Sequence, residues 1–444
     1  MQRRSFLKLA ATAPAFAAFP QIVRAETLGL NGKVSPSNKI TIASIGIGSQ
    51  GGGHLKALLN APDFRVAGLC DVDRKHLDTA LKLTANNKNY GKNHGALATD
   101  DFREILADPK IDALLCALPD HWHALPVILG AQAGKDIYTE KPFGFSIPEG
   151  RAMVNAVVRS GCVCQTGSQQ RSGRSFRRAV ELVRAGVIGK IKQIRVTLPA
   201  RMGPPMDAFA EQPVPSSLNY DLWLGPAPLA PYNEKRVHHY FRYNYDYSGG
   251  SLNDWIGHHY DIAAWGAGLS NTGPVAIQNA RAEFIQHPLY NTPKKYYFEA
   301  RYANGVVISV TAVDEDSKST DFIATGDGGT SFEGEEGWIQ VSRRGILYSS
   351  PRFATLPLPS DGFRLTDALS GHRENWAACI RDRRAPVAPA WETHRTSSVA
   401  ALANIAFRTG RSELKWNPDT EQIVDAPDAA ALLQRPYRAP WQLA

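Results

Sequence analysis

Residues Lys39-Ile-Thr-Ile-Ala-Ser-Ile-Gly-Ile-Gly-Ser-Gln-Gly-Gly-Gly-His54 form the most informative stretch of the chain. An apolar, β-branched run ends in glycines that open a helix, which is the local geometry of a first βα turn that binds a nucleotide. Gly46, Gly48 and Gly51 fit the pattern G-x-G-x-x-G, whose glycines allow a tight turn, the approach of a pyrophosphate and close packing of helix on strand. We count these glycines and Gln50 as cofactor-binding residues.

An acidic residue follows the second predicted strand. That strand spans Phe64-Arg-Val-Ala-Gly-Leu-Cys70, and Asp71 comes 71 − 51 = 20 residues after the last glycine of the motif. An acid at about this offset holds a ribose 2′-hydroxyl and repels a 2′-phosphate, so NAD is the predicted cofactor. Arg74 and Lys75 follow closely and leave NADP open.

The N-terminus has the pattern of a targeting segment. Gln2-Arg3-Arg4-Ser5-Phe6-Leu7-Lys8 is a twin-arginine motif, followed by a mildly apolar run over 9–19 and a cleavage point after Ala25. A membrane-spanning helix needs about 20 apolar residues, and this run is shorter and rich in alanine and proline. Residues 1–25 are therefore predicted to be a signal peptide that directs export by the twin-arginine machinery, into the periplasm, with no integral membrane segment in the mature chain.

Composition excludes several classes of protein. The net charge of +8 includes four cations of the leader, so the mature chain carries 8 − 4 = +4 without any basic block, which gives no indication of nucleic-acid binding. The five cysteines show neither a disulfide framework nor metal-ligand spacing, and we predict no metal site. With 43% hydrophobic residues, the chain is long enough for two cores.

From Gly46 onward, strand and helix patterns alternate, which is typical of a doubly wound parallel sheet. The predicted strands 111–118 and 136–139 end at two polar clusters, Pro119-Asp-His-Trp-His123 and Glu140-Lys141-Pro142. Ligands bind beyond the carboxyl ends of such strands, so both clusters are expected beside the glycine turn. The cofactor-binding residues predicted from them are Pro119, His123, Glu140 and Lys141.

Lys141 is also a candidate for catalysis and for substrate binding. A lysine near a nicotinamide can position a hydroxyl and favour its deprotonation. The alternative is a surface lysine that merely follows a strand.

A second catalytic pair is predicted in a helix after Gly249-Gly250. Asp254 and His258 are four residues apart, which places them on one face of a helix. A carboxylate that orients an imidazole gives a general base near neutral pH. Alternatively, Asp254 caps the helix and either His258 or the adjacent His259 is structural; both histidines are counted as substrate-binding candidates.

Two further stretches remain open between a functional and a structural role. Gln170 and Arg171 follow the predicted strand 162–166, where they either reach a nicotinamide or a sugar, or belong to a linker. Residues 204–247 are rich in proline and aromatics, which either stack on sugar faces or pack on a sheet or a subunit contact. Short alternating runs over 274–350 indicate antiparallel strands.

Taken together, the glycine turn, the cluster 119–123, Glu140-Lys141-Pro142 and the run Gly249 to Asp261 resemble the Gfo/Idh/MocA family (glucose-fructose oxidoreductase, inositol dehydrogenase and relatives). The resemblance implies an α/β protein: a Rossmann NAD(P)-binding domain over 38–166, a C-terminal α/β domain with a large open, mainly antiparallel sheet over 167–420, and a tail over 421–444. It also implies that Lys141 touches cofactor and substrate, that the pair Asp254 and His258 removes the proton of an alcohol, and that the protein forms a homodimer or homotetramer.

The predicted function is an exported oxidoreductase that transfers hydride between a retained nicotinamide cofactor and a hydroxyl of a sugar, polyol or glycoside. The twin-arginine route moves folded proteins, so the cofactor can leave the cytoplasm with the chain and must then be regenerated in place. One alternative is a glycosidase that uses NAD transiently for oxidation and elimination. The other is a noncatalytic sugar-binding protein.

Overall fold

The computed structural model describes residues 35, 38–92, 94–200, 203, 210–314, 320–357, 365 and 371–443. The predicted signal peptide, residues 1–25, lies outside the described residues. So do residues 204–209, which begin the stretch 204–247 rich in proline and aromatics, called the aromatic segment below.

The first sheet is parallel throughout and has the strand order β3-β2-β1-β4-β5-β6. Its central strand β1 (Ile40–Ile45) is an apolar run buried on both faces, as expected where helices cover both sides of a sheet. Ile45 pairs with Cys70 on one side and with Cys116 on the other, so three strands end level with one another. The loops that leave these strands therefore meet at one edge of the sheet. The other strands are β2 (Phe64–Cys70), β3 (Leu97–Thr99), β4 (Ala113–Cys116), β5 (Asp136–Thr139) and β6 (Cys164–Thr166).

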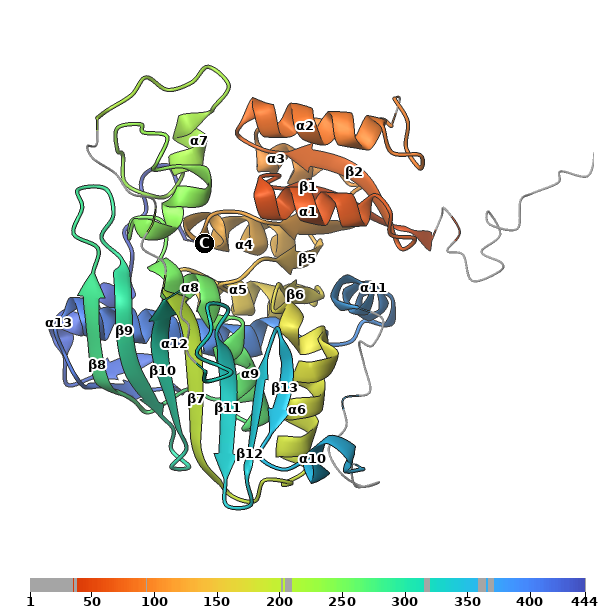
Figure 1. The fold of residues 1–444 in the computed structure, drawn as a ribbon. Helices are drawn as coiled ribbons and strands as arrows, with labels where there is room; N and C mark the ends of the chain where they lie inside the picture. The colour runs from red at the N-terminus through yellow and green to blue at the C-terminus, as the bar shows by residue number, and fades with distance from the viewer. Residues whose placement is uncertain are drawn as a thin grey trace, which may run out of the picture. The chain divides into compact units, whose positions relative to one another are not determined.

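Helices cover both faces of this sheet (Figure 1). One face packs against α1 (Ser49–Leu58), α2 (Arg74–Ala85) and, from much later in the chain, α11 (His372–Asp382). The other face packs against α3 (Phe102–Ala107), α4 (Ala124–Gln132) and α5 (Ile147–Ser160). Side-chain caps begin two of these helices, α2 and α5: Asp73 accepts from the backbone of α2, and Ser146 with Glu149 forms a capping box on α5.

The second sheet has nine strands in the order β13-β12-β11-β7-β10-β9-β8-β14-β15. Only the pair of β7 and β10 is parallel among its described ladders. One face packs against four helices, while Figure 1 shows the other face of the sheet toward the viewer. The four helices are α6 (Arg174–Arg184), α8 (Gly250–Ile256), α9 (His259–Gly266) and α12 (Ala390–Arg408). The strands are β7 (Ile191–Ala200), β8 (Ala276–Phe284), β9 (Pro293–Arg301), β10 (Val307–Asp314), β11 (Gly329–Gly334), β12 (Trp338–Ser342), β13 (Gly345–Tyr348), β14 (Leu414–Asn417) and β15 (Gln422–Val424).

The predicted α/β class, with a Rossmann sheet followed by a mainly antiparallel sheet, is confirmed. The stretch beyond residue 420 differs from the expected tail, because β15 pairs with β14 across that boundary and the chain continues into α13 (Pro427–Ala430) and η5 (Ala431–Leu433). Helix α11 also crosses the expected division, since Trp376 stacks on Phe64 of the Rossmann core with ring centroids 5.6 Å apart.

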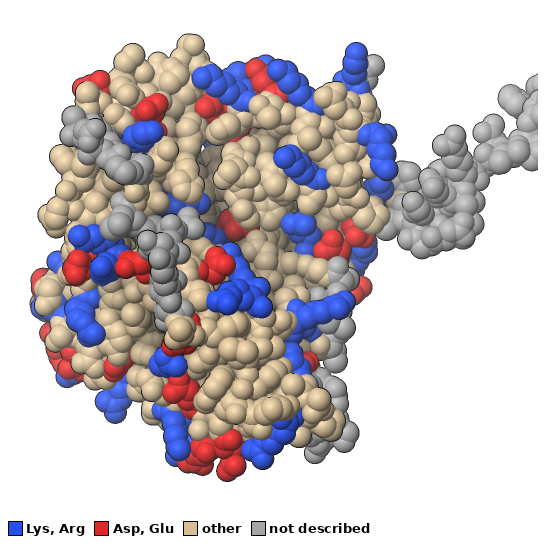
Figure 2. Space-filling model, in the orientation of Figure 1, with Lys and Arg blue, Asp and Glu red and all other residues tan. Residues whose placement is uncertain are grey.

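Charges of both signs are interspersed on the face shown in Figure 2. Among the described residues, no helix combines the length and the apolar character needed to cross a bilayer.

Candidate active site

The glycine turn after β1 has the shape that its sequence predicts. Gly46 has φ +79°, and a Cβ placed on it would lie 2.5 Å from the carbonyl oxygen of Ala117. A Cβ on Gly51 would lie 1.9 Å from the carbonyl oxygen of Gly46, so helix α1 packs directly on the turn. Gly48 differs, because the nearest neighbour of a Cβ placed on it would be a ring carbon of His76, 3.7 Å away. The space in front of Gly48 is therefore open to a ligand.

The N-terminus of α1 points its first N–H groups at this open space. The helix has no side-chain cap and no acidic residue in its first turn. Free N–H groups and the positive end of the helix dipole together suit a phosphate group. This cradle fits the pyrophosphate of a dinucleotide.

Asp71 joins the glycine turn to the end of β2. Its Oδ2 accepts from the backbone N–H of Ile47 at 2.7 Å, and its Oδ1 accepts from that of Asp73 at 2.9 Å. A carboxylate has about four acceptor positions, so Asp71 keeps capacity for a ribose hydroxyl. Arg74 was one reason to keep NADP as an alternative cofactor. In the structure its Nε atom lies 2.8 Å from Oδ1 of Asp78, at the exposed surface of α2.

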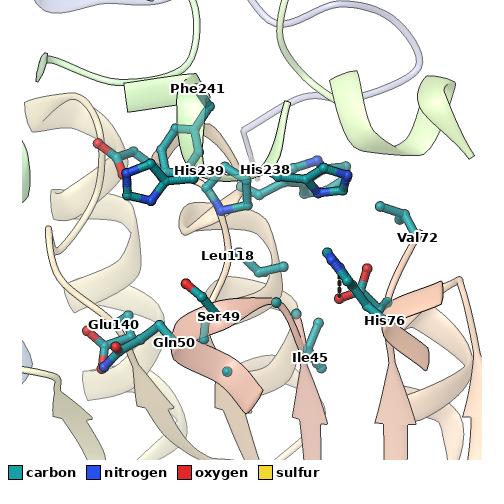
Figure 3. Close-up of a pocket in the computed structure, with 18 of the residues that line it drawn as sticks. Ile45, Ser49, Gln50, Val72, His76, Leu118, Glu140, His238, His239 and Phe241 are labelled. Carbon is teal, nitrogen blue, oxygen red and sulfur yellow. Dashed lines mark hydrogen bonds and ion pairs between the residues drawn. The ribbon is translucent and has the colours of Figure 1, made fainter. Parts of the chain in front are cut away.

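A cavity of about 580 Å³ opens in front of the turn. This volume lies within the range of pockets that bind small molecules and cofactors, roughly 300–1,000 Å³. Its walls include the glycine turn, Asp71, Pro119 and Lys141. Figure 3 shows the opposite wall, where His238, His239 and Phe241 face Ser49 and Gln50 across the open space.

Lys141 and Asp254 form a tight ion pair in this cavity. The Nζ atom of Lys141 donates to the Oδ1 atom of Asp254 at 2.6 Å and to its backbone oxygen at 2.8 Å. Each side chain is 14% exposed, and the Nε atom of Arg242 lies 3.3 Å from the same Oδ1. Burial acts against the charged carboxylate, but Lys141 and Arg242 outweigh burial and hold the pKa of Asp254 well below its usual range. Asp254 is therefore an anion that fixes the position of Lys141.

His258 also lines the cavity, but the helix expected around it is broken. Helix α8 ends at Ile256 and α9 begins at His259, so Asp254 and His258 do not share one helical face. The expected orientation of His258 by Asp254 is thus wrong in this structure, because Lys141 and Arg242 hold the carboxylate and His258 Nδ1 is buried with no partner among the described residues. Burial, followed by the charges of Lys141 and Arg343, lowers the pKa of His258 well below its ordinary 6.5. His258 is a neutral imidazole.

Glu140 lines the cavity and connects helix α1 to the segment around Gln169 through hydrogen bonds. Its Oε1 atom receives hydrogen bonds from His54 at 2.7 Å and from Gln169 at 2.8 Å. Burial disfavours the charge of Glu140, but the hydrogen bond from His54 and the charge of that ring outweigh burial, so the pKa is lowered. Glu140 thereby holds the loop before Lys141 against α1.

Four of the residues predicted for the site do not line the cavity. His123 contacts two backbone oxygens, of Pro142 at 2.6 Å and of Leu118 at 2.8 Å. The Nε2 atom of His259 lies 2.9 Å from the backbone oxygen of Asp327. These two rings hold backbone segments in place. The other two predicted residues are Gln170 and Arg171.

The polar atoms of the Gln170 amide are buried without a partner among the described residues. Arg171 is fully buried and makes two hydrogen bonds, of 2.6 and 2.7 Å, to the carboxylate of Asp261. It also pairs with Glu392. Arg171 therefore joins three elements of the second domain, η3 (Gln169–Ser172), α9 and α12.

The cavity contains polar side chains that the sequence did not single out. Asp120 accepts from the Ser248 hydroxyl at 2.6 Å, and burial raises its pKa. Its place in the cluster after β4 was a usable signal. Arg242 and His238 lie within the aromatic segment, and Arg343 comes from the turn between β12 and β13, where nothing in the local sequence indicates a site.

A Gly-x-Gly turn, a free helix N-terminus, an acid at the end of β2 and a lysine-carboxylate pair share one cavity, which is the site of a dinucleotide-dependent oxidoreductase. Residues 40–168 match the family model described as "Oxidoreductase family, NAD-binding Rossmann fold", and residues 204–443 match "Oxidoreductase family, C-terminal alpha/beta domain". The chain belongs to the Gfo/Idh/MocA oxidoreductase family, and its N-terminal domain is an NAD-binding Rossmann domain.

Two relatives are similar to the chain over part of their length. Myo-inositol 2-dehydrogenase of Thermotoga maritima is 28% identical over 166 residues, which are 37% of this chain and 47% of the relative. A glycosyl hydrolase family 109 protein of Shewanella woodyi is 26% identical over 161 residues, 36% of this chain and 34% of the relative. The match thus spans less than half of either relative.

The fold as a whole is similar to that of aldose-aldose oxidoreductase from Caulobacter crescentus, solved with glycerol. The two share a TM-score of 0.61 and 17% identity, over 85% of this chain and 99% of the other.

Proposed function

We propose that this protein is an NAD-dependent oxidoreductase that transfers hydride between a retained nicotinamide cofactor and a hydroxyl-bearing carbon of a sugar, polyol or glycoside. The observation that carries the proposal is a single cavity lined both by the glycine turn and by Lys141, Asp254 and His258. A dinucleotide on the turn leaves these three side chains for the substrate.

The side chains divide the proton chemistry of alcohol oxidation. NAD⁺ supplies the hydride acceptor, so the carbon loses a hydride and the hydroxyl must lose a proton. His258 is neutral and takes this proton. The Lys141 ammonium, held by Asp254, donates a hydrogen bond to the oxygen while its negative charge develops. Carbonyl reduction runs through the same groups in reverse.

Export and retention of the cofactor form part of this proposal. The twin-arginine motif supports a periplasmic location, where the chain has no free nicotinamide pool to exchange with. The part of the aromatic segment that carries α7 (Tyr220–Leu224) is bonded to the Rossmann domain next to the cavity: Arg74 N–H donates to the Ser217 oxygen at 2.8 Å and Asn219 N–H to the Val72 oxygen at 2.9 Å. These hydrogen bonds hold the segment against the Rossmann domain, which favours slow release of a bound dinucleotide.

A panel of sugars, polyols and glycosides tests the reaction. The purified protein is incubated with each compound while the bound cofactor is followed at the reduced-nicotinamide absorbance, and the products are analysed. The proposal expects reduction of the bound cofactor by at least one class of compound and its reoxidation by a carbonyl compound. Absence of any redox change over the whole panel would contradict it.

The similarity to glycosyl hydrolase family 109 proteins favours a second candidate, a glycosidase that oxidises a ring carbon transiently. Oxidation makes the neighbouring C–H acidic, the glycosidic group is eliminated, and water and hydride then return. The same cavity serves this sequence of steps. Release of an aglycone without net formation of NADH distinguishes it from an ordinary dehydrogenase.

Retention predicts that the protein purifies with its cofactor. Mass spectrometry of the denatured protein is expected to show about one NAD(H) per chain. Gly48→Val should purify without cofactor, because its side chain fills the space open to the pyrophosphate. Gly53→Val is the matched control: it lies in helix α1, which follows Gly48, its Cβ would have no neighbour within 4 Å, and the cofactor content of the variant should stay normal. Cofactor-free wild-type protein would contradict retention.

The neutral state of His258 predicts a pH profile. The base must be unprotonated to take a proton, and its pKa is lowered below 6.5, so the competent form persists at more acidic pH than for a free histidine. The kcat/KM for alcohol oxidation should therefore stay level as the pH falls to 6.5 and decline only below it. Steady-state rates across this range provide the measurement, and a decline centred above 6.5 would contradict the assignment.

A further inference from the structure

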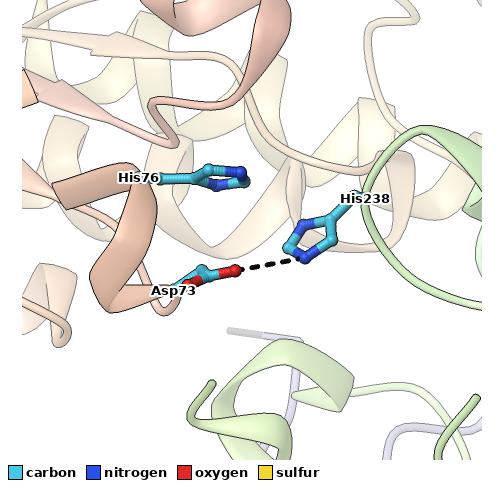
Figure 4. A group of neighbouring side chains, drawn as sticks. All are labelled: Asp73, His76 and His238. Atoms are coloured by element: carbon cyan, nitrogen blue, oxygen red, sulfur yellow. Dashed lines mark ion pairs between the residues drawn. The ribbon is translucent and has the colours of Figure 1, made fainter. Parts of the chain in front are cut away.

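Two histidines and an aspartate lie close together (Figure 4). Asp73, His76 and His238 each offer one ligand atom, and these atoms all lie within 4.8 Å of one another. His76 and His238 also line the cavity itself. Two imidazoles and a carboxylate are a donor set that proteins use for zinc and related ions.

Asp73 and His238 already have the spacing of two ligands on one ion. The Nε2 atom of His238 lies 3.2 Å from Oδ2 of Asp73. Two ligands of a tetrahedral zinc ion are about 3.3 Å apart, given metal–ligand distances of roughly 2.0–2.1 Å. Oδ1 of Asp73 caps helix α2 by accepting from Lys75 N–H at 2.9 Å, which fixes the carboxylate and leaves Oδ2 toward the histidine.

His238 adopts a backbone conformation that is uncommon for a residue other than glycine. Its φ is +53°, in the left-handed region. Strain of this kind persists where the surrounding structure requires it, and it recurs at functional sites. Here it accompanies a ring aimed at Asp73 from the start of η4 (His238–Tyr243), in a different domain from the other two residues.

His76 has the outer partner that is typical of a metal-binding histidine. Its Nδ1 atom lies 3.4 Å from Oδ2 of Asp71, which leaves Nε2 for a ligand. Metal-binding histidines generally donate their second N–H to a carboxylate or carbonyl oxygen, which fixes the ring. The rings of His76 and His238 stand edge to face, with centroids 4.8 Å apart.

We propose that Asp73, His76 and His238 bind one divalent transition-metal ion, of which Zn²⁺ suits this donor set. The ion would join α2 of the Rossmann domain to η4 and thereby hold the segment around η4 over the end of the cavity that contains Asp71. Its consequence for the bound dinucleotide is slower release. That consequence rests on the proposed retention of the cofactor, whereas the metal site itself does not.

Metal titration tests the site without any measurement of activity. The purified full chain, loaded with NAD and freed of metal by a chelator that is then removed, is titrated with ZnCl₂ by calorimetry and with CoCl₂ by visible absorption. We expect saturation at one ion per chain and a Co²⁺ spectrum typical of nitrogen and oxygen ligands. No binding, or binding without a defined stoichiometry, would overturn the proposal.

Two variants and one control identify the histidine ligands. His76→Gln and His238→Gln should each weaken Zn²⁺ binding by at least about 10-fold, since even an outer partner of a metal ligand is worth roughly 10- to 100-fold. His239→Gln is the matched control, because its ring is adjacent in sequence and lines the same cavity but is not part of the group. Circular dichroism confirms that each variant is folded. Unchanged affinity in His238→Gln, or equal loss in His239→Gln, would assign the binding elsewhere.

The effect on the cofactor is measured by the fluorescence of released NADH. ZnCl₂ should slow release from the wild-type protein several-fold and leave release from His238→Gln unchanged. Unchanged or faster release from a wild-type protein that binds Zn²⁺ would overturn the fastening role and leave the metal site intact.

Discussion

Lys141→Ala and His258→Ala should each lower turnover by about 10²- to 10⁴-fold, the usual worth of general acid-base help. Both side chains line the cavity and neither belongs to the glycine turn, so their loss should leave NAD binding largely intact. Rates with the best substrate of the panel and the NAD content of each purified variant are the two measurements. A fall in turnover together with normal NAD content supports the division between cofactor cradle and proton chemistry.

Asp254→Asn separates the positioning role of the carboxylate from the roles of its neighbours. The carboxylate holds Lys141 through a 2.6 Å hydrogen bond, and an asparagine oxygen can still accept one bond without the charge. Turnover should therefore fall less than in Lys141→Ala. Because the negative charge of Asp254 raises the pKa of His258, its removal should also move the acidic limb of the kcat/KM profile to lower pH.

Lys56→Ala, an exposed substitution in α1, is the control for loss of a lysine. Normal turnover in His258→Ala would contradict the assignment of the base. If His239→Ala were then inactive, the base would be His239, which also lines the cavity.

The Rossmann half of the site could be predicted because its signals are local. The runs 64–70 and 136–139 are strands with the predicted bounds, since each is a short apolar segment buried between helices. The glycines work through backbone space next to themselves in the chain, and Asp71 follows directly from the end of β2. Local sequence therefore determines where the nucleotide cradle lies.

The part of the cavity that contains Asp254 and His258 could be predicted only in part, because contacts between residues far apart in the sequence shape it. The spacing of Asp254 and His258 suggested one continuous helix, yet the helix is interrupted at Gly257. A Cβ on Gly257 would lie 3.0 Å from the Cβ of Lys141. This close approach of two domains has no local signal. The same is true of Arg343, which reaches the cavity from a hairpin turn.

The group Asp73, His76 and His238 was not predicted from the sequence, for a similar reason. Metal sites are recognised in a sequence by short spacings between ligands, and the spacing of the five cysteines predicted no metal site. Here His238 comes from a different domain, and only the folded chain brings it to Asp73.

Arg171→Met should destabilise the protein by about 3–5 kcal/mol, because removal of one partner of a buried ion pair leaves an uncompensated charge. Arg171 is fully buried and Asp261 is 1% exposed. The charges of Asp261 and Glu392 outweigh burial and raise the pKa of Arg171, and its guanidinium also stacks on Trp265 at 5.1 Å. Denaturant unfolding, read as the shift in midpoint and slope, measures the loss.

Two comparisons separate this structural role from the substrate contact that the sequence left open. Arg74→Ala breaks an exposed pair, with side chains 66% and 47% exposed, and should cost less than about 1 kcal/mol. Arg171→Met combined with Asp261→Leu removes both buried charges and should recover much of the lost stability. Because Arg171 lies outside the cavity wall, the folded Arg171→Met protein should keep a normal KM. A raised KM with unchanged stability would instead place Arg171 at the substrate, and the buried network around α9 and α12 would then not be what holds these helices together.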